Sequence, residues 1–279
     1  MAGPVGARHH SMQRLRRLSR RRSARRDEGC FVIDGPTLLA EALDAGVAVE
    51  VVVAEPGCPD ALLDRAGAAG AAVHRTTPGT LARVVDAVTP HGVAAVARIA
   101  DRPPADAVAA AGPLALVLVG VADPGNAGTL LRSAEAAGGG AVLFCDGSVD
   151  PYGPKCVRAS AGSLFRLAVT RESTSEAALA ALAAAGVPTL ATAARGAQAY
   201  DEADLAGPVA LVLGNEAHGL DPAVAGAATG AVTIPMVGRT ESLNVGMAGT
   251  ILCFEALRQR RAANRLDATP PRAAGCTTR

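Results

Sequence analysis

Short apolar runs alternate with Ala- and Leu-rich stretches of helical spacing over most of the chain. Between residues 28 and 100, the runs CFVI, VEVVVA and GVAAVARI are separated by patterns such as PTLLAEALDAG and PDALLDRAGAAG. Strands that alternate with helices of about ten residues are typical of α/β domains. The pattern therefore predicts a small α/β domain over residues 28–100.

The segment ADRPPADAVAAAGP interrupts this alternation, and its paired prolines predict a linker over residues 101–113. A second alternating series follows over residues 114–265, with strand candidates LALVLVG, AVLFC, FRLAV, VPTLAT, PVALVLGNE and AVTIP. Helices are expected near residues 126–137, 155–162, 175–185 and 243–261. This alternation predicts an α/β fold with a mostly parallel sheet, covered on both faces, whose ligands bind at the carboxyl ends of the strands.

Positive charge is concentrated at the start of the chain. Residues 1–26 contain nine arginines and no acidic residue, whereas residues 27–279 contain 18 basic and 26 acidic residues, a net charge of −8. We therefore expect residues 1–27 to form a flexible basic arm that holds a polyanion. A solvated tail fits the charge equally well, and a transit peptide is a third option, although the arm shows no convincing amphipathic stripe. The last segment, residues 266–279, is expected to be disordered.

Composition argues against several classes of function. Aromatic residues make up 2% of the 279 residues and tryptophan is absent, so stacking platforms for single-stranded bases are scarce. The six cysteines form no CxxC pair and no Cys/His ligand spacing, which argues against a metal site and a disulfide framework. No apolar run reaches about 18 residues, so we expect a cytoplasmic protein without a membrane segment. The segment GVADPGNAG fits neither the GxxxxGK nor the GxGxxG phosphate loop.

Three predicted strand ends carry unusual polar residues. After LALVLVG the chain continues as ADPGNAGTLLRSAEAAG, and a helix is expected to begin near Asn126. If Asn126 caps this helix, Leu130 and Ala134 lie on its buried face. Arg132 then points away from the core, and an exposed ion pair with Glu135 is the alternative explanation for it.

The second and third strand ends are ALVLGNEAHGL and IPMVGRTESLNVGMAGTILCFEALRQRR. The second places the carboxylate of Glu216 at the edge of the sheet, where it could equally cap the next turn. In the third, Ser242 is the expected cap of the closing helix. Capping does not explain Asn244, a poor helix former in the first turn. Gly246 and Gly249 weaken the helix unless another backbone or a ligand approaches closely.

Together these segments resemble one family. NAGTLLR is similar to its first motif, N-x-G-x-x-x-R, LVLGNEAHGL to its second, and IPMVGRTESLNVGMAGTILCFEALRQ to its third. The order and spacing over residues 114–261 resemble the SpoU/TrmH family of the SPOUT superfamily, which contains S-adenosylmethionine-dependent RNA ribose 2′-O-methyltransferases. The segment FVIDGPTLLAEALDAGVAVEVVVAE resembles, less specifically, the small RNA-binding domain of ribosomal-RNA members.

The resemblance implies a trefoil knot in the C-terminal domain, S-adenosylmethionine as cofactor and no metal. It also implies a homodimer packed through the knot, with apolar faces of the helices near 126–137 and 243–261 at the interface. The implied substrate is RNA, foremost large-subunit (23S) ribosomal RNA because of the N-terminal domain. Transfer RNA, or a non-catalytic RNA-binding role in ribosome assembly, are the alternatives.

The resemblance further implies roles for single residues. Arg132 is expected to orient the ribose 2′-hydroxyl and stabilise developing oxyanion charge, because an arginine acts as a base only in a strongly altered environment. Asn126 is expected to position the substrate and the first-motif loop, and Glu216, Ser242 and Asn244 to shape the catalytic pocket. The implied cofactor contacts are Thr192, Ala193, Leu213, Gly214, Asn215, Gly219, Ile234, Pro235, Met236, Leu243 and Asn244. Gly214 and Gly219 are expected to let the cofactor approach a bare backbone.

Overall fold

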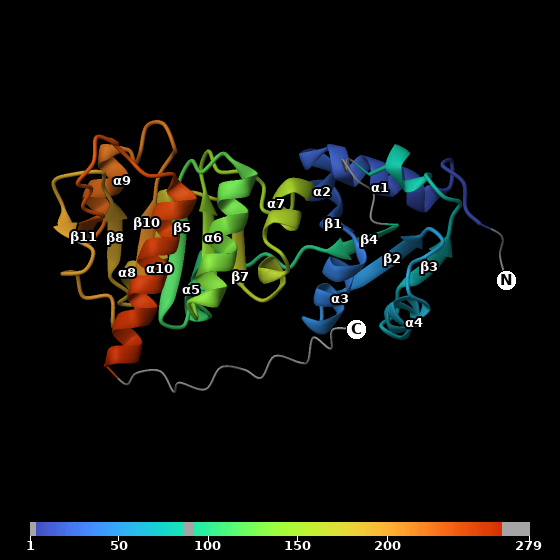
Figure 1. Cartoon of the computed structure of the whole chain (residues 1–279), viewed down its shortest axis with the longest axis horizontal. Coiled ribbons are helices and arrows are strands. Elements are labelled where there is room, and N and C mark those ends of the chain that lie inside the picture. The colour runs from blue at the N-terminus through green and yellow to red at the C-terminus, as the bar shows by residue number, and fades with distance from the viewer. Residues whose placement is uncertain (1–3, 86–91, 264–279) are drawn as a thin grey trace.

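Two β-sheets divide the chain into an N-terminal and a C-terminal part (Figure 1). The computed structural model describes residues 4–85 and 92–263, so the tail expected to be disordered at 266–279 lies outside the described residues. Within those two described ranges, no helix has the length and apolar character needed to cross a membrane.

The N-terminal sheet consists of β1 (Cys30–Asp34), β2 (Val49–Ala54), β3 (Ala72–Arg75) and β4 (Val93–Arg98), in the order β1-β4-β2-β3. β4 pairs antiparallel with β1 and β2, and β2 pairs parallel with β3. Helices α3 (Pro36–Asp44) and α4 (Asp60–Ala68) pack on one face of this sheet. The other face is covered by α1 (His10–Arg20), α2 (Arg22–Glu28) and the short 3-10 helix Leu81–Arg83.

From the charge of residues 1–27 we expected a flexible arm. The structure instead has the two helices α1 and α2 there, so the prediction is wrong for residues 10–27. Met12, Leu15 and Leu18 recur at helical spacing in α1 and are fully buried against strand residues such as Val32 and Val96. Burial of apolar surface contributes about 25 cal/mol per Å², which holds the helix on the sheet. Arginines stand between the positions of this stripe, so the charge of the segment conceals its apolar period in the sequence.

The C-terminal sheet has seven strands, all parallel, in the order β7-β6-β5-β10-β8-β11-β9. Their bounds are β5 (Leu114–Leu118), β6 (Ala141–Cys145), β7 (Ala168–Ser173), β8 (Thr189–Thr192), β9 (Gln198–Ala199), β10 (Val209–Leu213) and β11 (Gly230–Thr233). The predicted α/β class and the parallel sheet are confirmed, whereas the trefoil knot stays a prediction of the family resemblance.

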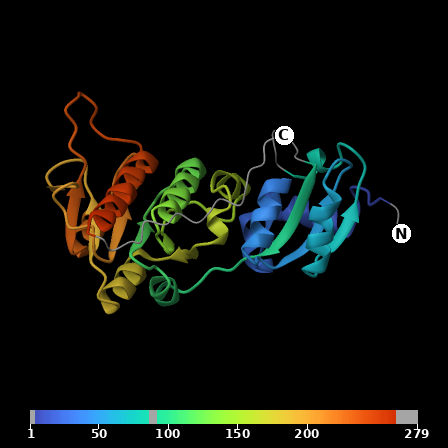
Figure 2. The same ribbon diagram turned by 60° about the horizontal axis from the view of Figure 1, so that its bottom comes forward.

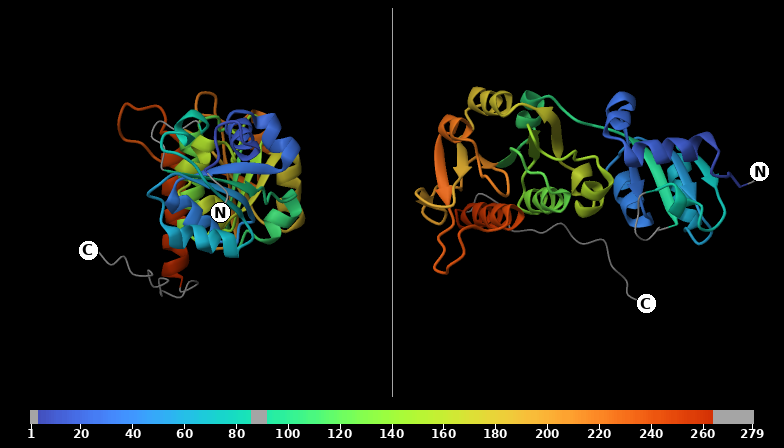
Figure 3. Two further views of the ribbon diagram at one scale, coloured as in Figure 1. Left: turned by 90° about the vertical axis from the view of Figure 1, so that its right-hand side faces the viewer. Right: turned by 90° about the horizontal axis from the view of Figure 1, so that it is seen from above.

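Helices cover both faces of this sheet, as Figures 2 and 3 show from two further directions. One face carries α6 (Pro124–Ala136) and α10 (Val245–Ala262), and the other carries α5 (Pro104–Ala109), α8 (Ser175–Ala184) and α9 (Pro222–Ala227). The expected linker therefore contains a helix, since Pro104 occupies the first position of α5, where proline is favoured. Ala107 and Val108 of α5 are buried under the sheet, which assigns the segment to the C-terminal domain.

Charged side chains connect the two domains. Helix α7 (Pro154–Ala159) lies between α6 and β1, and the chain just before it holds Asp150. The buried guanidinium of Arg25 in α2 lies 2.7 Å from the Asp150 carboxylate. Arg166 contacts Glu41 of α3 and Glu135 of α6 at 2.5 Å each, so one side chain joins the N-terminal domain to the helix that carries the first motif.

Candidate active site

The residues implied as cofactor contacts lie at the carboxyl ends of three neighbouring strands, β10, β8 and β11. Thr192 ends β8 and Ala193 follows it, Leu213 ends β10 and residues 214–215 follow it, and Ile234 to Met236 follow β11. The Thr192 hydroxyl donates to the Val212 carbonyl at 3.0 Å, and the Ala193 N–H donates to the Val232 carbonyl at 2.9 Å. The sheet therefore gathers segments that lie far apart in sequence at one edge, where parallel sheets bind ligands.

The loop after β10 folds back on itself. Asn215 and Gly219 exchange two backbone hydrogen bonds of 3.0 and 2.9 Å, and Gly219 adopts φ +69°. A Cβ at Gly214 would lie 2.5 Å from the carbonyl carbon of Gly219. The structure thus gives both glycines a reason within the loop itself, and the approach of the cofactor to their backbone stays a prediction. The Asn215 side chain then ties this loop to the loop after β5 that leads into the first motif, because its Nδ2 donates to the Gly120 carbonyl at 2.8 Å.

A chain of hydrogen bonds joins all three motifs. Asn126 donates through Nδ2 to the Glu216 carboxylate at 3.0 Å, and Asn244 donates through Nδ2 to Oδ1 of Asn126 at 3.0 Å. Glu216 also accepts from the backbone N–H groups of Ala122 and Asp123, at 3.3 Å each. Glu216 therefore caps a turn, as one alternative predicted. The turn that it caps lies just before the first motif and not directly after Glu216. The Asn126 amide is held from two sides.

The environment of Glu216 favours its ionised form. Partial burial raises the pKa of this carboxyl, but the hydrogen bonds from the Asn126 side chain and from backbone N–H groups outweigh it, so the pKa lies below the ordinary value. Glu216 is thus an acceptor that organises the loop before α6. A carboxylate in this state is poorly suited to act as a general acid.

Two helix caps differ from the sequence predictions. Helix α6 begins before Asn126, and its cap is Asp123, whose carboxylate accepts from the Asn126 N–H at 2.8 Å. Helix α10 is capped by Asn244, which accepts from the Met247 N–H at 3.2 Å, so the expectation that Ser242 caps it is wrong. Ser242 lies exposed in the preceding loop. The pair of Asp123 and Pro124 at the start of α6 is the signal that sequence reasoning missed, because proline is favoured at the first helical position after the cap.

The glycines of α10 lie where other side chains approach closely, whereas we expected another backbone or a ligand there. A Cβ at Gly249 would lie 2.2 Å from Cδ2 of Leu130, and a Cβ at Gly246 would lie 3.3 Å from Oδ1 of Asn126. Helices α6 and α10 are also joined by the hydroxyls of Ser133 and Thr250, 2.7 Å apart. The close packing of these helices brings the first and third motifs together.

Arg132 does not join this cluster. The side chain is exposed on α6 and forms no hydrogen bond or ion pair with any residue within 4–85 or 92–263. The alternative pairing with Glu135 is wrong, because the Glu135 carboxylate accepts from Arg166 at 2.5 Å and from Ser163 at 2.8 Å. The Arg132 guanidinium is therefore available to a ligand or to a second chain.

Apolar side chains next to the site face outward. Met247 and Phe254 of α10 are 62% and 45% exposed. Leu243, in the loop before α10, is 38% exposed. Large exposed apolar side chains gathered on one helix indicate a surface that another molecule covers.

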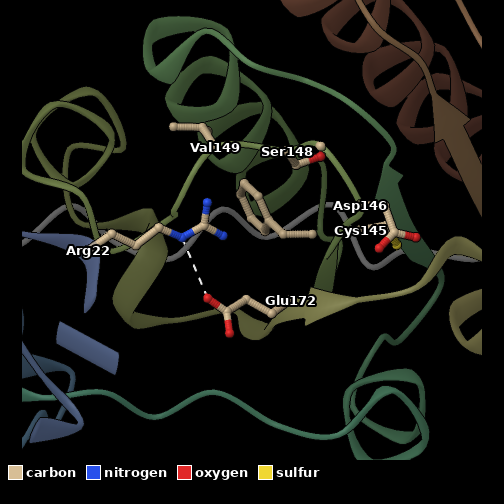
Figure 4. Close-up of a pocket in the computed structure, with 8 residues that line it drawn as sticks. Arg22, Cys145, Asp146, Ser148, Val149 and Glu172 are labelled. Carbon is tan, nitrogen blue, oxygen red and sulfur yellow. Dashed lines mark ion pairs between the residues drawn. The ribbon is translucent and has the colours of Figure 1, made fainter. Parts of the chain in front are cut away.

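A pocket of about 290 Å³ lies beside the site at the ends of β6 and β7 (Figure 4). Arg22 of α2 reaches across it to Glu172 of β7 at 3.5 Å, and Asp146, Ser148 and Val149 also line it. Glu172 has φ +55°, and the pairing of β6 with β7 shifts register next to it. The pocket spans the two domains, and none of the residues predicted from the motifs lines it.

Comparisons with known proteins agree with this geometry. The SpoU rRNA Methylase family model matches residues 113–254, and the MRM3-like substrate binding domain model matches residues 10–95. The chain is 32% identical over 225 residues to the 23S rRNA (guanosine(2553)-2'-O)-methyltransferase RlmP of Bacillus subtilis, covering 80% of this chain and 87% of that protein.

Solved structures share the fold over almost the whole chain. An AdoMet-bound rRNA methyltransferase from Sinorhizobium meliloti superposes with a TM-score of 0.83 at 30% identity, covering 92% of this chain and 97% of that one. The SpoU methyltransferase AviRb from Streptomyces viridochromogenes, in complex with AdoMet, superposes with a TM-score of 0.83 at 27% identity, covering 91% and 99%. Both likenesses include the N-terminal as well as the C-terminal domain.

Proposed function

This chain belongs to the SpoU rRNA methylase family, and on that premise we propose that its site transfers the methyl group of S-adenosylmethionine to a ribose 2′-hydroxyl of large-subunit ribosomal RNA. The observation that carries the proposal is the hydrogen-bond chain from Glu216 through Asn126 to Asn244, which unites the three motifs at the carboxyl edge of the sheet. The 23S rRNA activity in the name of the Bacillus subtilis relative supports the choice of substrate.

S-adenosylmethionine fits the ends of β8, β10 and β11. The half-buried side chains of Ile234 and Met236 and the partly exposed Leu243 offer apolar contacts for an adenine ring, and the backbone around Gly214 and Thr192 offers polar groups. The AdoMet-bound structures of similar fold support this assignment. When bound, this cofactor supplies an electrophilic methyl group on a sulfonium sulfur.

Arg132 orients the ribose 2′-hydroxyl and stabilises the negative charge that develops on its oxygen. A guanidinium keeps its charge, so it serves as a fixed electrostatic partner rather than as the group that takes the proton. Asn126, held on both sides by Glu216 and Asn244, fixes the first turn of the helix that carries Arg132. Because the methyl donor brings its own leaving group, positioning of the two reactants accounts for most of the rate enhancement.

A homodimer completes the site. Arg132 lies outside the polar cluster of its own chain, and Leu243, Met247 and Phe254 present apolar surface on or next to α10. Packing of these faces from two chains buries the apolar side chains, and it brings the Arg132 of one chain to the cofactor loops of the other.

The test is methylation of unmodified 23S rRNA transcript with labelled S-adenosylmethionine. Arg132→Ala is expected to lower kcat by a factor of about 100 to 1,000, the usual loss when one oxyanion-stabilising donor is removed. Arg102→Ala, an exposed arginine in the segment before α5, serves as a control and keeps full activity. Calorimetry with S-adenosylmethionine should show unchanged binding in both variants. Unchanged turnover in Arg132→Ala would refute the role of this residue, and failure of the wild type to bind the cofactor would favour a non-catalytic RNA-binding protein.

A further inference from the structure

The arginines of the N-terminal helices fall into two groups with different surroundings. Arg14 and Arg25 belong to the structural group, because each contacts a carboxylate within the folded chain. Arg14 lies 2.9 Å from Glu28 and 2.7 Å from Glu50, and buried Arg25 lies 2.7 Å from Asp150. Removing one partner of a buried ion pair leaves an uncompensated charge and destabilises the fold. We therefore assign Arg14 and Arg25 a structural role.

The second group faces outward. Arg16, Arg20 and Arg21 are exposed, and within the described part of the chain none of them pairs with a carboxylate. Together with Gln13 and Arg17 they line a groove of about 330 Å³. Arg16 also donates to the Arg83 carbonyl at 3.2 Å, which joins α1 to the 3-10 helix Leu81–Arg83.

The packing of α1 on the sheet determines which way these exposed arginines point. Its arginines lie opposite the stripe of Met12, Leu15 and Leu18 that anchors α1 to the sheet. Helices α1 and α2 lie on the same side of the molecule as the loops that follow β5 and β10 (Figure 1). Where α2 begins, Arg22 reaches over the pocket at the ends of β6 and β7 (Figure 4). The exposed arginines of α1 therefore lie on the side of the molecule that carries the loops of the proposed site.

We propose that the outward face of α1 and its C-cap, formed by Arg16, Arg20 and Arg21, binds the sugar-phosphate backbone of the RNA substrate and directs it toward the catalytic edge. The substrate class follows from the proposed function, and the surface follows from the charge and packing of α1. A guanidinium presents a fork of donors that matches two phosphate oxygens. With aromatic residues at 2% of the chain, contact with the backbone rather than stacking on bases is the chemistry that this surface offers.

The experiment compares two triple variants of the full-length protein. Arg16→Gln/Arg20→Gln/Arg21→Gln removes the outward face. Arg26→Gln/Arg65→Gln/Arg75→Gln removes the same charge from exposed arginines of the same domain that already pair with Asp27, Asp44 and Asp60. Binding to unmodified 23S rRNA transcript is measured by filter binding from about 50 to 300 mM salt.

Loss of three phosphate contacts is expected to raise Kd by about 10- to 100-fold and to reduce the slope of log Kobs against log salt by about 2. The control variant should bind nearly as wild type. Methylation by the outward-face variant should show a raised KM for RNA at unchanged kcat, because the interaction is made equally in the ground state and the transition state. Arg16→Lys/Arg20→Lys/Arg21→Lys keeps the charge and should retain most of the salt dependence.

Equal Kd and equal slope in the two Gln triple variants would overturn the inference while leaving the proposed function intact. Weakened binding to whole ribosomal particles, with unchanged binding to naked transcript, would also overturn it and assign the face to an acidic protein. Conversely, the proposed function alone would be refuted if the wild type bound the transcript with the expected salt dependence but transferred no methyl group. Urea unfolding of each variant separates a loss of contact from a loss of fold.

Discussion

Glu216 shows how a single residue determines the local geometry of the site. Its carboxylate accepts from two backbone N–H groups of the first-motif loop and from the Asn126 amide. The first-motif loop and the loop after β10 are thereby fixed to each other through one side chain. Its contribution is electrostatic, because these donors stabilise the ionised carboxylate more than the neutral acid.

This arrangement predicts a pH-dependent stability difference between wild type and Glu216→Gln. The folded-state pKa of Glu216 lies below its ordinary value of 4.5, so its stabilising effect is complete above about pH 4.5 and is lost as the pH falls through the folded-state pKa. Thermal unfolding from pH 7 to pH 3 should show wild type more stable at pH 7, with the gap closing below about pH 4.5. Glu202→Gln, at an exposed position, should give no such gap. A gap of constant size down to pH 3 would contradict the argument.

At the scale of the elements, the first motif depends on how closely α6 approaches its neighbours. Gly128 of the motif faces α7, and a Cβ at this position would lie 2.3 Å from Cβ of Ala159 and 2.7 Å from its carbonyl carbon. Gly249 of α10 likewise allows Leu130 of α6 to pack closely, because a Cβ at this position would overlap the Leu130 side chain. These glycines set the position of the helix that carries Arg132.

Gly128→Ala is therefore expected to destabilise the protein by about 1 to 3 kcal/mol, the usual cost of inserting an atom into a packed contact. The same displacement of α6 should lower methylation activity. Gly226→Ala in α9 is the matched control, because a Cβ there meets nothing within 4 Å, and alanine should be neutral or stabilising by up to about 1 kcal/mol. Urea unfolding followed by circular dichroism measures both. Equal stability of the two variants would show that α6 and α7 can move apart freely.

For the whole molecule, the surface of α10 is the feature that a single chain leaves incomplete. Met247 is 62% exposed, although it lies on the same helix as buried Leu252 and Cys253. The buried Arg25–Asp150 pair and the bridging Arg166 already fix the two domains of one chain to each other. We propose a second copy of the chain as the molecule that covers this face.

Met247→Asp is expected to convert a dimer into a monomer, because a carboxylate placed in an apolar interface has no partner there. Light scattering coupled to gel filtration should give the mass of two chains for wild type and of one chain for the variant. Methylation activity should fall when the dimer dissociates, because Arg132 of one chain would then be separated from the cofactor loops of the other. Val73→Asp, at an exposed apolar position of β3, should change neither mass nor activity. A wild type that runs as a monomer at every concentration would rule out the proposed two-chain site.

The sequence by itself determined the α/β class, most of the elements and the identity of the motif residues. Apolar periodicity and turn residues act within about ten residues, so they are visible in the chain without its fold. The same local rules were insufficient where charge concealed a pattern, as in α1, and where two candidate caps stood close together, as with Ser242 and Asn244.

Only the tertiary structure decided which residues meet. Asn126 bonds Glu216 across 90 residues and Asn244 across 118, while Arg132, six positions after Asn126, meets neither. The strand order β6-β5-β10-β8-β11 places these loops at one edge, and that order depends on the packing of the whole sheet. No local pattern encodes it, because contacts between distant segments are chosen by the total burial of apolar surface and not by neighbours in the chain.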